Sequence, residues 1–164
     1  MSRTRKQAQE DFESELVFHR HEWRIQRVGW VLVALFLALA VGGVFGNGPL
    51  SRAHADSDAG RLDYERFTRY GLSTDLVVTP VRSAHGVTRV EISGDYLEAF
   101  RIERITPEPA AVRMSGPNIV YEFASAGPGA SISFHMRPQR LWRKTATIAI
   151  DGGAPLRISQ LTYP

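Results

Sequence analysis

The side chains best suited to chemistry in this 164-residue chain are five histidines and a few short runs of carboxylates, since the chain contains no cysteine. The segment HEWRI at 21–25 begins like the helical zinc motif H-E-x-x-H, but Ile25 stands in place of the second histidine. Asp56 and Asp58 lie in a run that lacks the length and terminal glutamate of an EF-hand loop. The sequence contains no G-x-S-x-G nucleophile motif. It therefore predicts no metal site, no cofactor and no catalytic residues, and we expect a protein that is not an enzyme.

The charge balance argues against a nucleic-acid partner. The chain has 20 lysines and arginines against 17 aspartates and glutamates, for a formal net charge of +3. Nucleic-acid binding requires clustered positive charge that displaces counterions, and this near balance supplies little.

One dense basic stretch follows a predicted strand, and it contains Arg137, Arg140, Trp142, Arg143 and Lys144. One interpretation is a turn with solvated arginines in which Trp142 covers the core. The other is a contact with anionic lipid head groups or an acidic partner, because arginine and tryptophan are frequent at interfaces. The sequence leaves both open.

One long apolar segment divides the chain into a short N-terminal part and a larger C-terminal part. No charged residue occurs between Arg27 and Arg52. As a helix, residues 28–45 would extend about 27 Å, close to the thickness of a bilayer's hydrocarbon core. The start of the segment carries side chains typical of a membrane interface, namely Trp23, Arg24, Arg27 and Trp30. These features predict a transmembrane helix over residues 28–50.

The basic residues on the two sides of this segment predict its orientation. Six precede it, whereas Arg52, Arg61 and Arg66 follow within a comparable distance. The excess favours a cytoplasmic N-terminus and an external C-terminal part, which in a bacterium is the periplasm. Ala53-His54-Ala55 has the form of a signal-peptide cleavage site, which leaves cleavage as an alternative. The long charged region before the apolar run favours an uncleaved anchor in the bacterial inner membrane.

Small residues recur at every fourth position of the predicted span: Ala34, Ala38, Gly42 and Gly46. Residues four apart share a helix face, and small side chains there let a second helix approach closely. We therefore expect this face to contact an integral membrane protein. The preceding residues 1–27 predict a cytoplasmic juxtamembrane helix, either solvated or lying on the membrane or a partner.

The remainder of the chain reads as a polar linker at 51–61 and a β domain at 62–164. The fold class is thus a single transmembrane helix plus an all-β domain, because many short strands with regular turns favour an immunoglobulin-like β-sandwich. Residues 95–100 are an alternative helical turn. The predicted strands are 62–70, 75–80, 87–92, 99–105, 111–114, 118–123, 130–136, 146–151 and 156–163.

Three segments around the span carry a resemblance to known proteins: FHRHEW at 18–23, QRVGW at 26–30 and FGNGPLS at 45–51. Together with the pattern around Phe134, Pro138 and Tyr163-Pro164, the chain resembles uncharacterised bacterial single-pass inner-membrane proteins with a small periplasmic β domain. The resemblance implies a topology and no activity.

These features favour a non-catalytic accessory subunit that binds or stabilises a larger membrane complex, such as a transport or energy-transducing one. Its partners would be integral membrane protein subunits and the lipid bilayer. The alternatives are a membrane-anchored periplasmic binding module and an envelope enzyme.

Overall fold

The computed structural model describes residues 23, 25–42, 48, 50–81, 86–124 and 129–164. The chain forms two compact units, Met1–Val41 and Gly42–Pro164. Residues 1–22 and 24, which make up most of the predicted juxtamembrane helix, lie outside the described residues.

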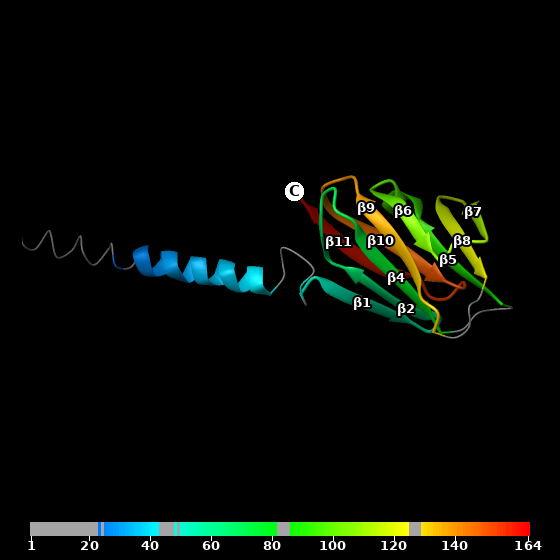
Figure 1. Ribbon diagram of the computed structural model, residues 1–164, viewed down its shortest axis with the longest axis horizontal. Coiled ribbons are helices and arrows are strands. Elements are labelled where there is room, and N and C mark those ends of the chain that lie inside the picture. The colour runs from blue at the N-terminus through cyan, green and yellow to red at the C-terminus, as the bar shows by residue number, and fades with distance from the viewer. Residues whose placement is uncertain (1–22, 24, 43–47, 49, 82–85, 125–128) are drawn as a thin grey trace, which may run out of the picture. The chain divides into compact units, whose positions relative to one another are not determined.

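The first unit contains one helix, described over residues 25–41 (Figure 1). Its residues are mostly leucine, valine and alanine, and every one of them is exposed. The guanidinium of Arg27 lies 4.5 Å from the centre of the Trp23 ring, a cation–π contact. Within the described part of the chain, no helix has both the length and the mean hydropathy needed to cross a membrane.

The second unit is a β-sandwich of two sheets with a short helix, α2 (Gly94–Leu97), and this confirms the predicted all-β architecture (Figure 1). One sheet has five strands in the order β1-β2-β4-β9-β6, and the other has six in the order β3-β11-β10-β5-β8-β7. The strands are β1 (Arg52–Ser57), β2 (Gly60–Glu65), β3 (Phe67–Arg69), β4 (Thr74–Pro80), β5 (Val87–Ser93), β6 (Phe100–Thr106), β7 (Ala111–Ser115), β8 (Asn118–Ala124), β9 (Ile132–Pro138), β10 (Trp142–Ile150) and β11 (Leu156–Tyr163).

The linker predicted at 51–61 is wrong, because most of this segment forms β1, the turn after it and the start of β2. β1 pairs antiparallel with β2, with Ala53 opposite Tyr64. Small alanines alternate with polar residues along β1, so that Ala53 faces the interior at 6% exposure while His54 is exposed. At the turn, Ser57 Oγ donates a hydrogen bond to the carbonyl of Gly60 at 3.1 Å. The sandwich therefore begins at residue 51 and not at 62.

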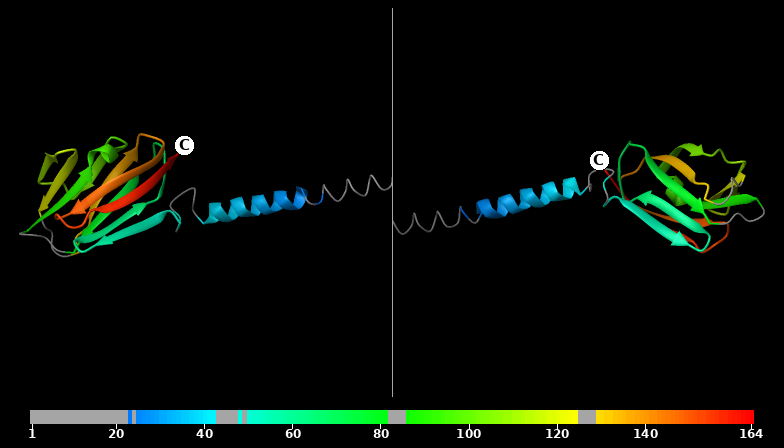
Figure 2. Two further views of the ribbon diagram at one scale, coloured as in Figure 1. Left: turned by 180° about the vertical axis from the view of Figure 1, so that it is seen from behind. Right: turned by 60° about the horizontal axis from the view of Figure 1, so that its bottom comes forward.

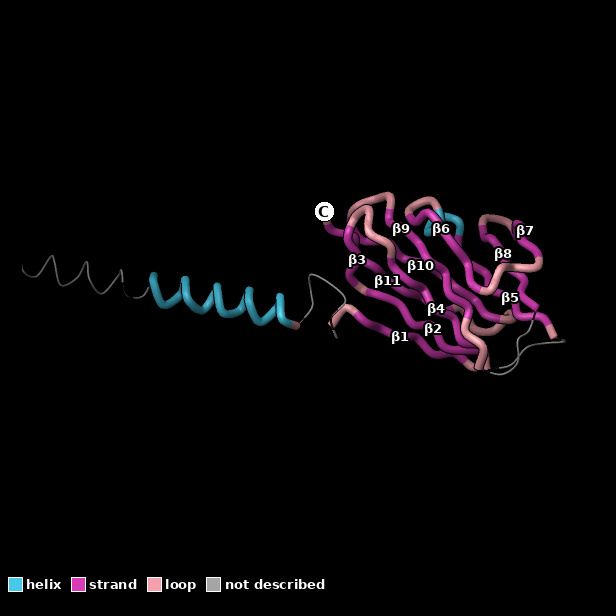
Figure 3. Tube along the Cα trace, viewed as in Figure 1, coloured by secondary structure: helices cyan, strands magenta, loops and turns pink. Residues whose placement is uncertain are grey.

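The single strand predicted at 62–70 is also wrong, since it is divided at Arg66 between the two sheets. β2 belongs to the five-stranded sheet, and β3 lies parallel to β11 in the six-stranded sheet (Figure 3). The Arg66 N–H donates to the carbonyl of Ser51 at 2.6 Å, and the Leu161 N–H donates to the carbonyl of Arg66 at 2.8 Å. This backbone corner joins both sheets to the first residue of the sandwich.

The alternative prediction of a helical turn at 95–100 is correct in type, but its bounds differ. The helix α2 occupies Gly94–Leu97, and β6 follows it. A glycine begins α2 because the backbone approaches closely here. The Gly94 N–H donates to the carbonyl of Pro117 at 3.0 Å, and a Cβ at Gly94 would lie 2.3 Å from that oxygen.

Aromatic side chains from both sheets fill the core. Phe134 of β9 has no exposed surface, and its ring packs edge-on against Tyr121 at 5.3 Å and Phe123 at 6.0 Å between centroids. Strands β4 and β9 alternate buried residues with more exposed ones, as expected of strands with one face on a core.

A chain of hydrogen-bonded polar groups links α2 to one strand of each sheet. The Tyr96 hydroxyl of α2 donates to Gln160 Oε1, and Gln160 Nε2 donates to the carbonyl of Glu65 at 2.7 Å. Both side chains are almost fully buried, so each hydrogen bond satisfies a group that has lost water. Burial raises the pKa of the Tyr96 hydroxyl far above its ordinary value.

This pKa shift predicts a loss of stability at alkaline pH. Above about pH 10 the unfolded chain ionises Tyr96 whereas the folded chain keeps the proton, so the stabilisation is complete below about pH 10 and falls as the pH rises. In Tyr96→Phe this contribution is missing. The difference in unfolding free energy between the two proteins should shrink by about 1 kcal/mol from about pH 10 to about pH 11, measured by urea denaturation. A difference that stays constant over this range would contradict the assignment.

Candidate functional site

The outer face of the five-stranded sheet carries a shallow polar groove over β1, β2 and β4. Its volume is about 340 Å³, and its lining includes Arg52, His54, Asp63, Glu65, Asp75 and Val77. These residues share the groove because strand pairing places His54 opposite Asp63 and Arg52 opposite Glu65. Three carboxylates against one arginine give the groove an excess of negative charge, which suits a cationic group.

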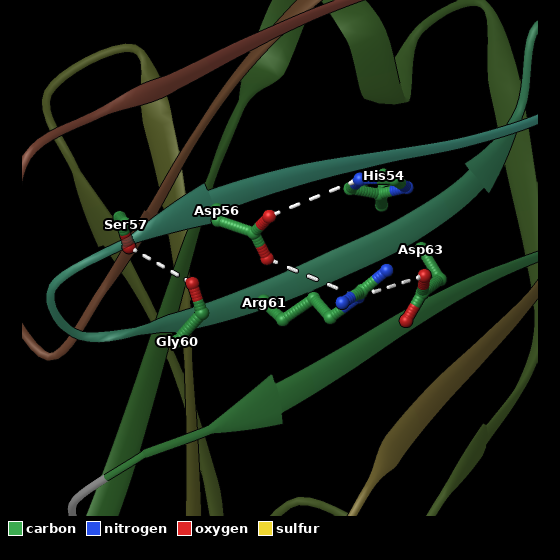
Figure 4. A network of polar contacts seen from close by, with 6 residues as sticks. All are labelled: His54, Asp56, Ser57, Gly60, Arg61 and Asp63. Carbon is green, nitrogen blue, oxygen red and sulfur yellow. Dashed lines mark hydrogen bonds and ion pairs between the residues drawn. The ribbon is translucent and has the colours of Figure 1, made fainter.

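A network of exposed ion pairs borders this groove on β1 and β2 (Figure 4). Arg61 Nε lies 3.2 Å from Asp63 Oδ1 and 3.8 Å from Asp56 Oδ1. His54 Nε2 lies 4.0 Å from Asp56 Oδ2. Exposed pairs of this kind contribute at most about 1 kcal/mol each, so they orient side chains more than they stabilise the sheet.

A second histidine–aspartate pair lies across β4 and β9, where His135 Nδ1 is 2.5 Å from Asp75 Oδ1. Such a pair orients an imidazole, but acyl-transfer chemistry also requires a nucleophile bonded to it. Among the described residues, no hydroxyl forms a hydrogen bond with His135. In the same part of the chain, no three histidine, aspartate or glutamate side chains are grouped to hold a metal ion. His135 and Asp75 thus form an exposed polar pair on β9 and β4.

The residues of the predicted basic stretch take different positions. Arg137 of β9 forms an ion pair with Glu103 at 2.8 Å, and Arg140 lies 3.6 Å from Glu98. Lys144 is half-buried, and Arg143 is exposed on β10.

Trp142 is 73% exposed, so the interpretation in which it covers the core is wrong. Its backbone has φ of 76°, in the left-handed region that residues other than glycine rarely adopt. The turn thus holds a large aromatic side chain in solvent on a strained backbone.

Further apolar side chains at the same end of the sandwich were not found from the sequence. Leu50, Tyr70 and Leu72 are between 51% and 56% exposed. Tyr70 N–H donates to the carbonyl of Tyr163 at 2.8 Å, which joins the β3–β4 loop to the end of β11. Both views of Figure 2 show the β9–β10 turn and the end of β11 at this same end. The sequence feature that could have indicated them is Gly71, which lies between two apolar residues and marks a turn. Its φ of 74° is a turn conformation that favours glycine.

The residues predicted for the membrane region lie partly within the described chain. Trp23, Arg27, Trp30, Ala34 and Ala38 belong to the exposed helix, and Gly42 follows it. Their four-residue spacing places Ala34 and Ala38 on one face of that helix. Arg24 and Gly46 lie outside the described residues.

Two sheets packed face to face make the second unit a β-sandwich protein domain. No protein-family model and no curated protein matches the chain. Among solved structures, the chain is similar to a cohesin module from the Clostridium perfringens ATCC13124 family 33 glycoside hydrolase, with 10% sequence identity and a TM-score of 0.44. The match covers 66% of this chain and 98% of that module.

Proposed function

We propose that the protein is a non-catalytic accessory subunit of the bacterial inner membrane. In this proposal residues 28–50 form a single transmembrane helix with a cytoplasmic N-terminus, and the domain is an immunoglobulin-like periplasmic sandwich. The subunit binds or stabilises a larger membrane protein complex, such as a transport or energy-transducing one. The uncharged sequence between Arg27 and Arg52 supports the anchor.

The single observation that carries the proposal is the apolar exposure of the N-terminal helix. Large side chains point outward all around it, among them Trp30 at 67%, Leu32 at 60% and Phe36 at 59% exposure. A helix that is apolar on every side needs an apolar environment, which is either lipid or the interior of a larger assembly. Arg27 and Trp23 at its start suit the interface between lipid and water.

A membrane-anchored periplasmic binding module is the second candidate, and the polar groove favours it. The groove offers Asp63, Glu65 and Asp75 on one open face, where a cationic side chain of a partner would find carboxylates. The two functions differ in what the helix does. If the protein is a binding module, its function should survive the exchange of residues 28–50 for an unrelated apolar helix. If it is an accessory subunit that recognises its partner within the membrane, the same exchange should abolish its function.

The direct test enlarges one small residue on the predicted packing face. Ala38→Leu places a large side chain where a partner backbone would pack, and helix association in lipid depends on such close contact. We expect several-fold less co-purified membrane protein after mild detergent extraction of tagged chains, quantified by mass spectrometry at equal expression.

Leu39→Ile is the matched control, because it keeps the polarity of the helix and lies off the small-residue face. Both variants should insert as the natural chain does, which carbonate extraction would check. Equal recovery of partner from both variants would remove the accessory-subunit proposal.

A further inference from the structure

The end of the sandwich at which the chain enters it combines apolar and basic side chains. The apolar members are Leu50, Tyr70, Leu72 and Trp142, all more than half exposed. The basic members are Arg66, Arg69, Arg140 and Arg143, all exposed. We call these eight residues the entry face.

Most of the positive charge of the entry face is available to a ligand. Arg140 Nη2 lies 3.6 Å from Glu98 Oε2, and both side chains are more than half exposed. Among the described residues, no carboxylate forms an ion pair with Arg66, Arg69 or Arg143. Arginine beside exposed tryptophan, tyrosine and leucine is typical of a surface that contacts lipid head groups. At the boundary between head groups and acyl chains, arginine can bind phosphate and the apolar side chains can contact lipid.

Hydrogen bonds hold Ser51, the first residue of the sandwich, beside the entry face. Ser51 is fully buried, and its Oγ donates to the carbonyl of Phe67 at 3.1 Å. Its own carbonyl accepts from the Arg66 N–H at 2.6 Å. In the sequence, Ser51 directly follows the predicted span, which extends to residue 50.

The backbone at Trp142 supplies an independent observation. A φ of 76° disfavours any side chain with a Cβ, yet the position carries a tryptophan that remains 73% exposed. Strained positions persist where the surrounding structure holds them, and they concentrate at binding sites. An exposed tryptophan held in this way is suited to contact a surface outside the domain.

We propose that the entry face docks on an anionic lipid bilayer, with Trp142, Tyr70 and Leu72 at the head-group level and the arginines on lipid phosphates. The proposal rests on the membrane anchor proposed above and adds how the sandwich is held against the membrane. An anchored sandwich is a tethered ligand for its own bilayer, so weak contacts suffice because the local lipid concentration is high. Anionic lipids strengthen the contact, since basic residues near the surface are attracted to it.

The test uses single-tryptophan versions of the full chain, reconstituted in vesicles of phosphatidylcholine with or without phosphatidylglycerol. Trp23→Phe with Trp30→Phe leaves Trp142 as the reporter, and lipids with a nitroxide on the head group serve as quencher. We expect strong quenching of Trp142 in vesicles that contain phosphatidylglycerol and several-fold less in phosphatidylcholine alone. Absence of quenching in both would overturn docking, and an acidic protein surface would become the better candidate for the entry face.

Charge reversal distinguishes this face from general attraction. Arg143→Glu should reduce the quenching of Trp142 several-fold. Arg157→Glu is the matched control, because it makes the same change on an exposed residue at the opposite end of β11 and should leave the quenching unchanged. Equal loss in both variants would also overturn the proposal.

A separate reporter tests the anchor. Trp23→Phe with Trp142→Phe leaves Trp30, and lipids brominated on the acyl chain should quench it in every vesicle. Quenching of Trp30 without quenching of Trp142 would keep the anchor and reject docking. Absence of quenching at Trp30 would reject the anchor, and docking with it.

Discussion

Replacing Phe134 by alanine is expected to lower the free energy of unfolding of the sandwich by about 3–5 kcal/mol. Phe134 has no exposed surface and lies on β9, between β4 and β6 in the five-stranded sheet. Its ring meets Tyr121 and Phe123 from the other sheet, so its removal leaves a cavity at the centre of the core. Urea denaturation followed by circular dichroism measures the loss.

The neighbouring residue provides the control for this prediction. His135→Ala changes the next position on the same strand, where the side chain points outward and pairs with Asp75. Its loss should cost no more than about 1 kcal/mol, as is usual for exposed pairs. A Phe134→Ala variant as stable as His135→Ala would mean that β9 is not central to the core.

Replacing Gln160 by leucine is expected to cost about 2–4 kcal/mol, although the new side chain is apolar and of similar size. The change removes both hydrogen bonds of the Gln160 side chain at once. The Tyr96 hydroxyl loses its acceptor, and the carbonyl of Glu65 loses its side-chain donor. Groups left buried without a hydrogen bond carry the full cost of their lost hydration. The loss would be measured by urea denaturation near neutral pH.

A double-mutant cycle shows whether the hydrogen bond itself is responsible. Tyr96→Phe in the Gln160→Leu background removes the hydroxyl that was left without a partner. The double variant should therefore be more stable than the sum of the two single losses implies. Strictly additive losses would show that Tyr96 and Gln160 act independently.

Most strand positions from residue 75 onward follow from the sequence, because β-branched and aromatic runs there are separated by glycine and proline turns. The strand predicted at 146–151 is an exception, since β10 already begins at Trp142. β1 was missed because its residues are small or polar, and propensity alone reads RAHADS as a loop. Ala53 and Ala55 face inward only because β2 lies alongside to pair with them. The break at Arg66 was missed for a similar reason, since a corner between sheets depends on partners that are far apart in sequence.

The composition of the candidate surfaces was only partly predictable. The basic residues of the β9–β10 turn stand out in the sequence, but the exposure of Trp142 depends on a backbone angle that no residue pattern indicates. The loop that carries Tyr70 and Leu72 joins them through backbone hydrogen bonds of Tyr70 to Tyr163 and of Gly71 to Pro138. The pairing of His54 with Asp63 and of Asp75 with His135 depends on strand register, which one sequence does not specify.

The position of β11 determines when this domain can fold. β11 lies between β3 and β10, and the Thr68–Thr162 hydrogen bond joins residues 94 positions apart. Hairpin-type pairs such as β1–β2 and β7–β8 can form as soon as both of their strands are free to fold, whereas β3 has no partner in its sheet until residues 156–163 arrive. Until then the nascent chain holds an incomplete sheet with open edges, a state prone to aggregation. Completion of the sandwich is thus a late event that follows synthesis of the whole domain.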